Sequence, residues 1–192
     1  TAHISMRLLF STLIVFCSFA LSLGKSPYIS TVYEFCPAPG QYVNDAPEYQ
    51  PGDSEKDMLA KVEENLVGEK QPGLISLGAF GGYVVFGFDH PVVNVPGDYD
   101  FKIYGNAFDS ASASSGGASE PGIVMVMRDD NENGLPDDTW YELAGSEHSN
   151  ESTIRNYSIT YYRPDSEKTP DPDPVNKSII DRTYIRWTSA AG

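Results

Sequence analysis

Positive charge is scarce in this sequence of 192 residues, which has 13 Lys and Arg against 27 Asp and Glu and a net charge of −14. Nucleic-acid binding needs clustered Lys and Arg to neutralise phosphates, and anionic membrane surfaces attract the same kind of cluster. The few basic residues are instead spread along the chain. We therefore expect neither nucleic acid nor an anionic membrane surface as a partner.

Cysteine is nearly absent, since only Cys17 and Cys36 occur. Cys17 lies in an apolar N-terminal run, so removal of that run would leave a lone thiol that cannot form an internal disulfide. No histidine lies near Cys36, and the prolines that follow it indicate an irregular loop. We expect Cys36 to be a buried structural residue and the fold to depend on packing, with a metal ion as an additional staple.

Histidine is equally scarce, with His3, His90 and His148 in the whole chain. No nucleophile elbow, zinc-binding helix or phosphate loop is present. Paired carboxylates can hydrolyse glycosides. The most closely spaced Asp and Glu residues of this chain, however, lie in the turn at 128–143, where a bound cation would account for them. We expect a protein that is not an enzyme, and a secreted glycoside-active enzyme is the less favoured alternative.

Only one long apolar run occurs, at residues 8–23, after an arginine. Its length is typical of a signal peptide and too short for a membrane span. We predict a signal peptide at 1–24 that includes extra residues upstream of the first methionine, cleavage after Ser22 or Gly24, and export to the cell surface or the medium. Lipidation at Cys17 would need a small residue before it. No membrane span is expected after cleavage.

The remaining chain, 25–192, predicts an all-β fold in a single domain. Short β-type runs are separated by Gly, Pro, Asn and Asp, and the run 99–105 alternates apolar and polar residues. Many short strands favour two stacked antiparallel sheets, a jelly-roll-like β-sandwich. The eight predicted strands are 28–35, 73–77, 83–88, 99–105, 123–127, 139–143, 157–162 and 183–187.

One segment breaks the β pattern and predicts a single helix at 54–67. Asp53 or Ser54 can cap its start, and Gly68 can end it in the left-handed conformation. Its apolar stripe is expected to close one end of the sandwich, and a partner-binding helix is the alternative. The stripe consists of Met58, Leu59, Val62 and Leu66.

Six carboxylates crowd into residues 128–143, RDDNENGLPDDTWYEL. Like charges this close raise the free energy of the compact state unless something neutralises them. The spacing D-x-N-x-N-G fits a calcium loop, with Gly134 at the sharp turn and Trp140 where an EF-hand has glutamate. The predicted calcium ligands are Asp129, Asn131, Asn133, the Leu135 carbonyl, Asp137 and Asp138, with Glu142 as an alternative to Asp138.

Two alternatives to calcium stay open for this turn. Magnesium fits less well, because so many protein oxygens suit the larger and looser shell of calcium. An acidic solvated hairpin loop with Asn-Gly turn chemistry would need no ion at all.

Five further segments span most of residues 28–187: YEFCPAPGQYVNDAPEY, ISLGAFGGYVVFGFDHPVVNVPGDYDFKIYGNAF, SEPGIVMV, NGLPDDTWYELAGSE and ITYYRPD. Together they resemble a family of exported Bacteroidetes surface proteins that sometimes carry PKD-type repeats. Their core is also similar to secreted β-sandwich domains of jelly-roll or galactose-binding-like character. The resemblance implies an envelope-exposed binding or adhesion module, associated with uptake of glycans or corrinoids, and family members that continue past residue 187.

A binding module of this kind would use aromatic rings, because sugars stack their C–H faces on Trp and Tyr. We expect Tyr141, Asn106 and Glu120 near the functional rim. Trp140 and Tyr141 cannot both face inward in a regular strand. The alternative function is a structural or adhesion domain that recognises a surface protein. The possible aromatic platforms are Trp140, Tyr141, Tyr161, Tyr162 and Trp187.

Overall fold

The computed structural model describes residues 24–69, 73–107, 109, 117, 121–177 and 179–190. The regular elements among these residues are six short strands and one short helix, so the prediction of a mainly β structure is confirmed. The predicted signal peptide, apart from Gly24, lies outside them, and so does Cys17. The elements are β1 (Thr31–Cys36), α1 (Glu55–Leu66), β2 (Tyr83–Gly87), β3 (Met125–Met127), β4 (Trp140–Glu142), β5 (Ser158–Tyr162) and β6 (Arg186–Ala190).

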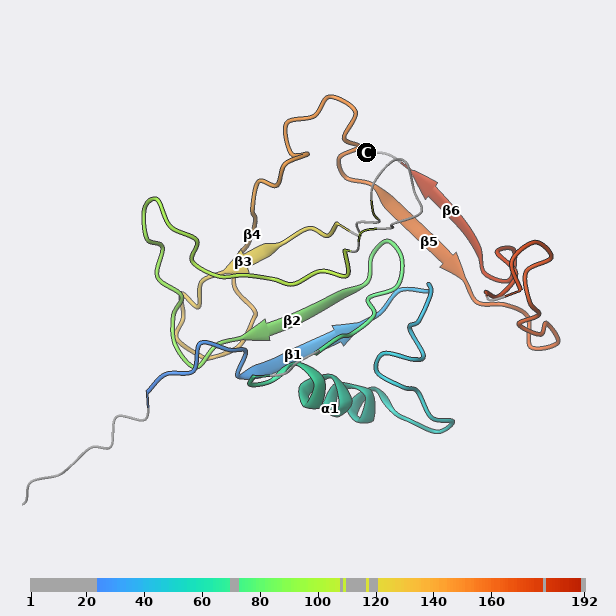
Figure 1. Cartoon of the computed structure of the whole chain (residues 1–192), viewed down its shortest axis with the longest axis horizontal. Helices are drawn as coiled ribbons and strands as arrows, with labels where there is room; N and C mark the ends of the chain where they lie inside the picture. Colours follow the sequence, from blue (N-terminus) through green and yellow to red (C-terminus); the bar gives the residue numbers. More distant parts are fainter. Residues whose placement is uncertain are drawn as a thin grey trace, which may run out of the picture.

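The strands pair into three separate antiparallel sheets of two strands each, β1–β2, β3–β4 and β5–β6. In Figure 1, α1 lies along one side of β1–β2, while β3–β4 and the β5–β6 ribbon stand on other sides of the molecule. No ladder joins one sheet to another within the described ranges. The finer prediction of a closed sandwich is therefore not shown here.

The β1–β2 pair carries the best-buried strand position. Val32 is 3% exposed and pairs with Phe86, and a bulge separates this pair from the one between Glu34 and Val85. Apolar side chains on one face of a sheet are buried when another element packs against them, and here α1 packs against β1. The small core of the described residues lies at this seam.

Helix α1 begins and ends as the sequence predicts. Ser54 is the N-cap, and its Oγ accepts from the backbone N–H of Asp57 while the Asp57 carboxylate accepts from the Ser54 N–H. Gly68 has φ of +79° and donates its N–H to the Ile29 carbonyl at 2.9 Å. Val62, on the predicted apolar stripe, is fully buried. No helix in the described ranges has the length and hydropathy of a membrane span.

The predicted strand 73–77 joins no ladder, but its backbone anchors a neighbouring loop. Ser76 donates its N–H to the Ala46 carbonyl at 2.6 Å and its Oγ–H to the Gln41 carbonyl at 2.8 Å. The loop 37–49, which follows β1, is thereby tied to the segment that leads into β2. Extended backbone in this region satisfies its polar groups through irregular contacts rather than through a sheet.

Four detailed predictions are wrong, and the first is the strand at 73–77, which joins no ladder within the described ranges. The run 99–105 is not a strand, and its apolar positions stay outside, since Tyr99 is fully exposed and Ile103 is 51% exposed. No strand pairs with this run, so alternation alone could not bury one of its faces. Strand β6 lies three residues later than the predicted 183–187. Cys36 is exposed at the end of β1 rather than buried.

The buried position in α1 yields a stability prediction. Val62→Ala removes two fully buried methyl groups, so we expect it to lower the free energy of unfolding by about 2 kcal/mol. Val175→Ala is the matched control, because Val175 is 85% exposed and its truncation should have almost no effect. Urea denaturation followed by circular dichroism measures both, and equal losses would show that the seam is not the core.

The β1–β2 pair also predicts a response to high pH. Tyr83 Oη donates to the Glu34 carboxylate at 2.5 Å, and this hydrogen bond raises the pKa of Tyr83 to about 12. The stabilisation should be complete below pH 10, where the unfolded state also keeps its proton, and should disappear as pH rises from about 10 to about 12. The test measures the free energy of unfolding of the wild type and of Tyr83→Phe between pH 10 and pH 12. A difference between the two proteins that stays constant over this pH range contradicts the prediction.

Candidate functional site

The oxygen-rich turn, defined here as residues 129–138, connects β3 to β4. Met127 pairs with Trp140 at the base of this hairpin, so the strand ends hold the turn closed. Two residues of the turn have left-handed backbone, Glu132 with φ of +57° and Gly134 with φ of +75°. Glycine adopts this conformation without steric cost, which explains the Asn-Gly pair in the sequence.

Asp129 holds the turn together from its first position. Its Oδ1 accepts from the backbone N–H of Asn133 at 3.1 Å, and its Oδ2 accepts from the N–H of Gly134 at 2.8 Å. These two hydrogen bonds hold the carboxylate of the predicted first ligand against the backbone in the middle of the turn.

Asp137 lies on the same side of the turn as the two asparagine amides. Asn133 Nδ2 donates to its two carboxylate oxygens at 3.2 and 3.0 Å, and Asn131 Nδ2 donates to Oδ1 at 3.3 Å. The Oδ1 atoms of these asparagines accept backbone N–H groups within the turn, including that of Leu135 at 2.7 Å. A cation beside Asp137 would require both amides to rotate so that oxygen replaces nitrogen.

Asp138 closes the turn from its other end. Its Oδ2 accepts from the backbone N–H of Asp130 at 2.9 Å, while its own N–H points to the sulfur of Met127 at 3.3 Å. The Asp130 carboxylate forms an exposed ion pair with Arg128 at 3.1 Å. All carboxylates from the predicted ligand set thus have N–H partners from within the turn.

Hydrogen bonds join Asn133 to Asp129 and join both asparagines to Asp137, and these contacts do not test the metal. No group of three or more His, Cys, Asp or Glu side chains in the described part of the chain is arranged to hold an ion. The predicted set also uses asparagine oxygens and the Leu135 carbonyl, which such a group does not include. Calcium in this turn stays a prediction.

The predicted ligand-binding residues differ in their placement. Tyr141, on β4, is 60% exposed, and its neighbour Trp140 is half-buried, so the two rings do lie on opposite faces. Asn106 is exposed in an irregular segment, and no hydrogen bond joins it to Tyr141 among the described residues. Glu120 lies outside the described residues.

A second aromatic surface lies on the β5–β6 ribbon. Tyr161 and Trp187 are directly opposite each other and share one face, and Trp187 is 54% exposed. Tyr161 Oη donates to the Phe80 carbonyl at 3.0 Å, which ties this face to the segment before β2. Tyr162 lies on the other face, where the Arg186 guanidinium stands 4.5 Å from its ring centre.

Each of the two histidines in the described residues lies beside a carboxylate. His90 Nδ1 lies 2.6 Å from the Asp89 carboxylate, and this contact lowers the pKa of Asp89. His148 Nδ1 lies 3.5 Å from Glu142, and the His148 carbonyl accepts from Arg155. His90 Nδ1 is hydrogen-bonded to a carboxylate, whereas His148 Nδ1 is a buried ring nitrogen without a hydrogen-bond partner among the described residues.

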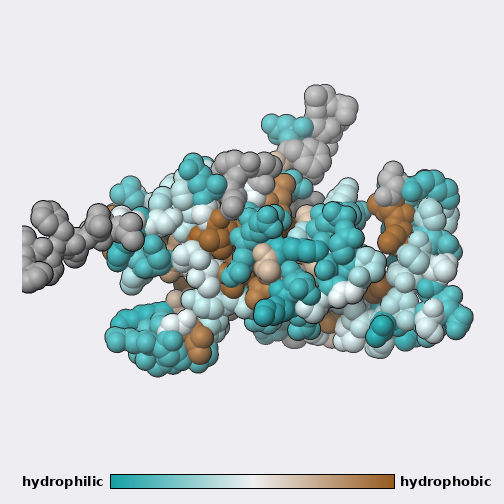
Figure 2. All heavy atoms as spheres, turned by 90° about the horizontal axis from the view of Figure 1, so that it is seen from below, coloured by the Kyte–Doolittle hydropathy of each residue, from teal (hydrophilic) through white to brown (hydrophobic). Residues whose placement is uncertain are grey.

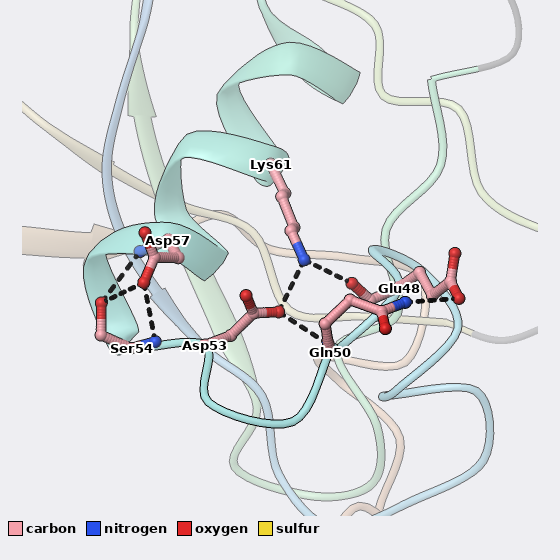
Figure 3. A network of polar contacts seen from close by, with 6 residues as sticks. All are labelled: Glu48, Gln50, Asp53, Ser54, Asp57 and Lys61. Carbon is pink, nitrogen blue, oxygen red and sulfur yellow. Dashed lines mark hydrogen bonds and ion pairs between the residues drawn. The ribbon is translucent and has the colours of Figure 1, made fainter.

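Sequence reasoning missed a polar network around the start of α1, drawn in Figure 3. Lys61 Nζ donates to the Asp53 carboxylate at 2.6 Å and to the Glu48 carbonyl at 2.9 Å. The same Asp53 oxygen accepts from the Gln50 N–H at 2.7 Å. Both hydrogen bonds lower the pKa of Asp53, and the one from Lys61 has the larger effect. An eight-residue spacing between Asp53 and Lys61 carried no motif that could have revealed the contact.

This network separates two hollows beside α1. One, of about 410 Å³, lies between the end of β1, the loop 37–49 and the first turn of the helix. The other, of about 560 Å³, lies beside Pro47 and Lys61 and is lined mainly by polar side chains. From the sequence, Pro37 and Pro39 predict only an irregular loop and not this hollow.

No protein-family model matches the sequence, and no curated protein matches it. The resemblance to exported Bacteroidetes surface proteins therefore stays a prediction.

The turn yields a prediction that does not depend on an ion. Asp129→Ala removes the acceptor for two backbone N–H groups, so hydrogen exchange at Asn133 and Gly134 in chelator should become about fivefold faster. Asp130→Ala is the matched control, because its carboxylate contacts only the exposed Arg128. Unchanged exchange in the Asp129 variant would mean that this carboxylate does not order the turn.

Proposed function

We propose that this protein is a non-catalytic exported or cell-surface binding module that captures a glycan or another nutrient such as a corrinoid. The observation that carries the proposal is the exposed ring of Tyr141 on β4, the strand that directly follows the oxygen-rich turn. A planar ring with an open face offers a stacking surface to a sugar or to a macrocycle. Because turn and ring share one hairpin, anything that orders the turn also orients the ring.

The oxygen-rich turn is proposed to bind calcium. Asp129, Asp137 and Asp138 would supply carboxylate oxygens, and Asn131, Asn133 and the Leu135 carbonyl would supply neutral ones. Hard oxygen donors on alternate residues suit calcium. The bound ion would offset the repulsion among the carboxylates, which amide N–H groups offset in its absence.

The β-sandwich remains part of this proposal. Each of the three sheets has only two strands, and two-stranded ribbons are marginal on their own in water. Stacking of the ribbons through their apolar faces would bury side chains that lie at the surface, such as Ile123, which is 76% exposed. A jelly-roll-like arrangement is the architecture that the resemblance implies for this purpose.

A second function is favoured by a different observation. The outer edges of the two-stranded sheets carry unpaired backbone groups, and Figure 2 shows hydrophobic residues in separate patches on one face. Open strand edges can pair with a strand of another chain. A structural or adhesion domain that recognises a surface protein is therefore the alternative to small-ligand capture.

Calorimetry tests the calcium part. Wild type should take up calcium with measurable heat, and free calcium at about 100 times its Kd should raise the free energy of unfolding by about 2.7 kcal/mol. Asp129→Asn and Asp137→Asn should each abolish the heat, while Asp130→Asn, outside the predicted ligand set, should keep it. Absence of heat for the wild type, with melting indifferent to EDTA, contradicts a calcium site.

A ligand panel tests the binding part. Purified protein is screened against immobilised glycans and against cobinamide and cobalamin, first with calcium and then with EDTA. We expect one class to bind, Tyr141→Ala to lose at least about tenfold in affinity, and Trp187→Ala, on the other ribbon, to be unaffected. Binding lost only in the Trp187 variant moves the site to β5–β6. Binding to neither class contradicts nutrient capture and leaves the protein-partner function.

A further inference from the structure

The smaller hollow beside α1 is a formed cleft and belongs to none of the surfaces described above. Its volume of about 410 Å³ falls within the range of roughly 300–1,000 Å³ that is typical of small-molecule sites. Phe35 at the end of β1 and Tyr49 supply aromatic rings, and Pro37 and Met58 add apolar wall. A site of this composition favours a ligand with an apolar body.

The walls of the cleft are held by contacts outside it. Ala38, which is 8% exposed, donates its N–H to the Leu77 carbonyl at 3.0 Å. Gly78 has φ of +76°, and a Cβ added there would lie 1.9 Å from the Ala38 carbonyl oxygen. The two backbone segments can therefore approach this closely only because residue 78 is a glycine. On the other side, the Lys61 contact with the Glu48 carbonyl fixes the end of the loop. The cleft is therefore preorganised, which lowers the entropic cost of binding.

Both charged residues that line the cleft are acids, Asp53 and Glu55 at the start of α1, and Lys61 beside the cleft pairs with Asp53. Lys61 reaches Asp53 only through Oδ2, the oxygen that also accepts the Gln50 N–H, and no protein donor in the described residues contacts Oδ1. The Glu55 carboxylate likewise has no hydrogen-bond donor within the described ranges.

The helix end does not reverse this charge. A helix N-terminus carries a partial positive charge, but here the Ser54 hydroxyl and the Asp57 carboxylate complete a capping box. Asp57 itself adds a third acid to the first turns, with Lys56 and Lys61 as the only basic side chains on the helix. An anionic ligand would meet net repulsion, and a cationic one would meet net attraction.

We propose that this cleft binds a small organic cation, an ammonium group carried on an apolar body. The cationic group would lie between the carboxylates of Asp53 and Glu55 and the ring of Tyr49, while the apolar body would contact Phe35 and Met58. Ammonium groups bind to aromatic faces and to carboxylates at once, and these contacts also form at exposed sites. This site does not rest on the calcium turn or on Tyr141.

The test uses choline and its uncharged isostere 3,3-dimethyl-1-butanol, which match in shape and differ in charge. Both are titrated into ¹⁵N-labelled full-length protein in EDTA, and chemical shifts are followed. Choline should give saturable shifts confined to residues around 35–58, and the isostere should bind at least about fivefold more weakly. Equal affinities, or no saturable shifts with choline, overturn the proposal.

Variants locate the binding. Glu55→Gln and Tyr49→Ala should each weaken choline binding by at least about threefold, whereas Tyr49→Phe should keep it because the ring remains. Glu63→Gln, also exposed on α1, is the control for charge, and Tyr141→Ala is the control for the other aromatic surface. Choline binding that survives both cleft variants would overturn the assignment. Loss of glycan or calcium binding in other experiments would leave it untouched.

Discussion

The contact between α1 and β1 is the constraint on which the described structure depends. Val62 on the helix and Val32 on the strand are buried there. Together with Ala38 they form the buried hydrophobic core of the described residues. Burial of apolar surface is the main favourable term in folding, so a core this small concentrates the stabilisation between residues 30 and 90. The cleft, the polar network and the β1–β2 pair all lie around this contact.

An acidic chain has to offset its carboxylates, and this one does so in three ways. In the oxygen-rich turn, backbone and asparagine N–H groups surround Asp129 and Asp137. At the start of α1, Lys61 pairs with Asp53. Asp173, only 2% exposed, accepts from backbone N–H groups and from Arg182 Nε, and these hydrogen bonds hold its pKa well below the usual range.

The two aromatic surfaces and the cleft offer different chemistry. Tyr141 and Trp187 stand on narrow ribbons, where a ring can stack on a flat ligand but little can enclose it. The hollow beside α1 is open to solvent and is lined by aromatic, apolar and acidic side chains. Flat platforms suit extended ligands such as glycans, whereas a hollow of this volume suits a small molecule. One domain of this size can carry both, because they lie on different elements.

The sequence by itself determined the features that depend on neighbours along the chain. The helix begins at Ser54 and is followed by a left-handed Gly68, and the hairpin turn closes through Asp129, because caps and turns are formed by residues a few positions apart. Tertiary structure decided what depends on distant partners. Among the described residues, the alternating run 99–105 pairs with no strand, and Cys36 is exposed. Strand pairing and burial require segments far apart in sequence to meet, and periodicity carries no information about which segments meet.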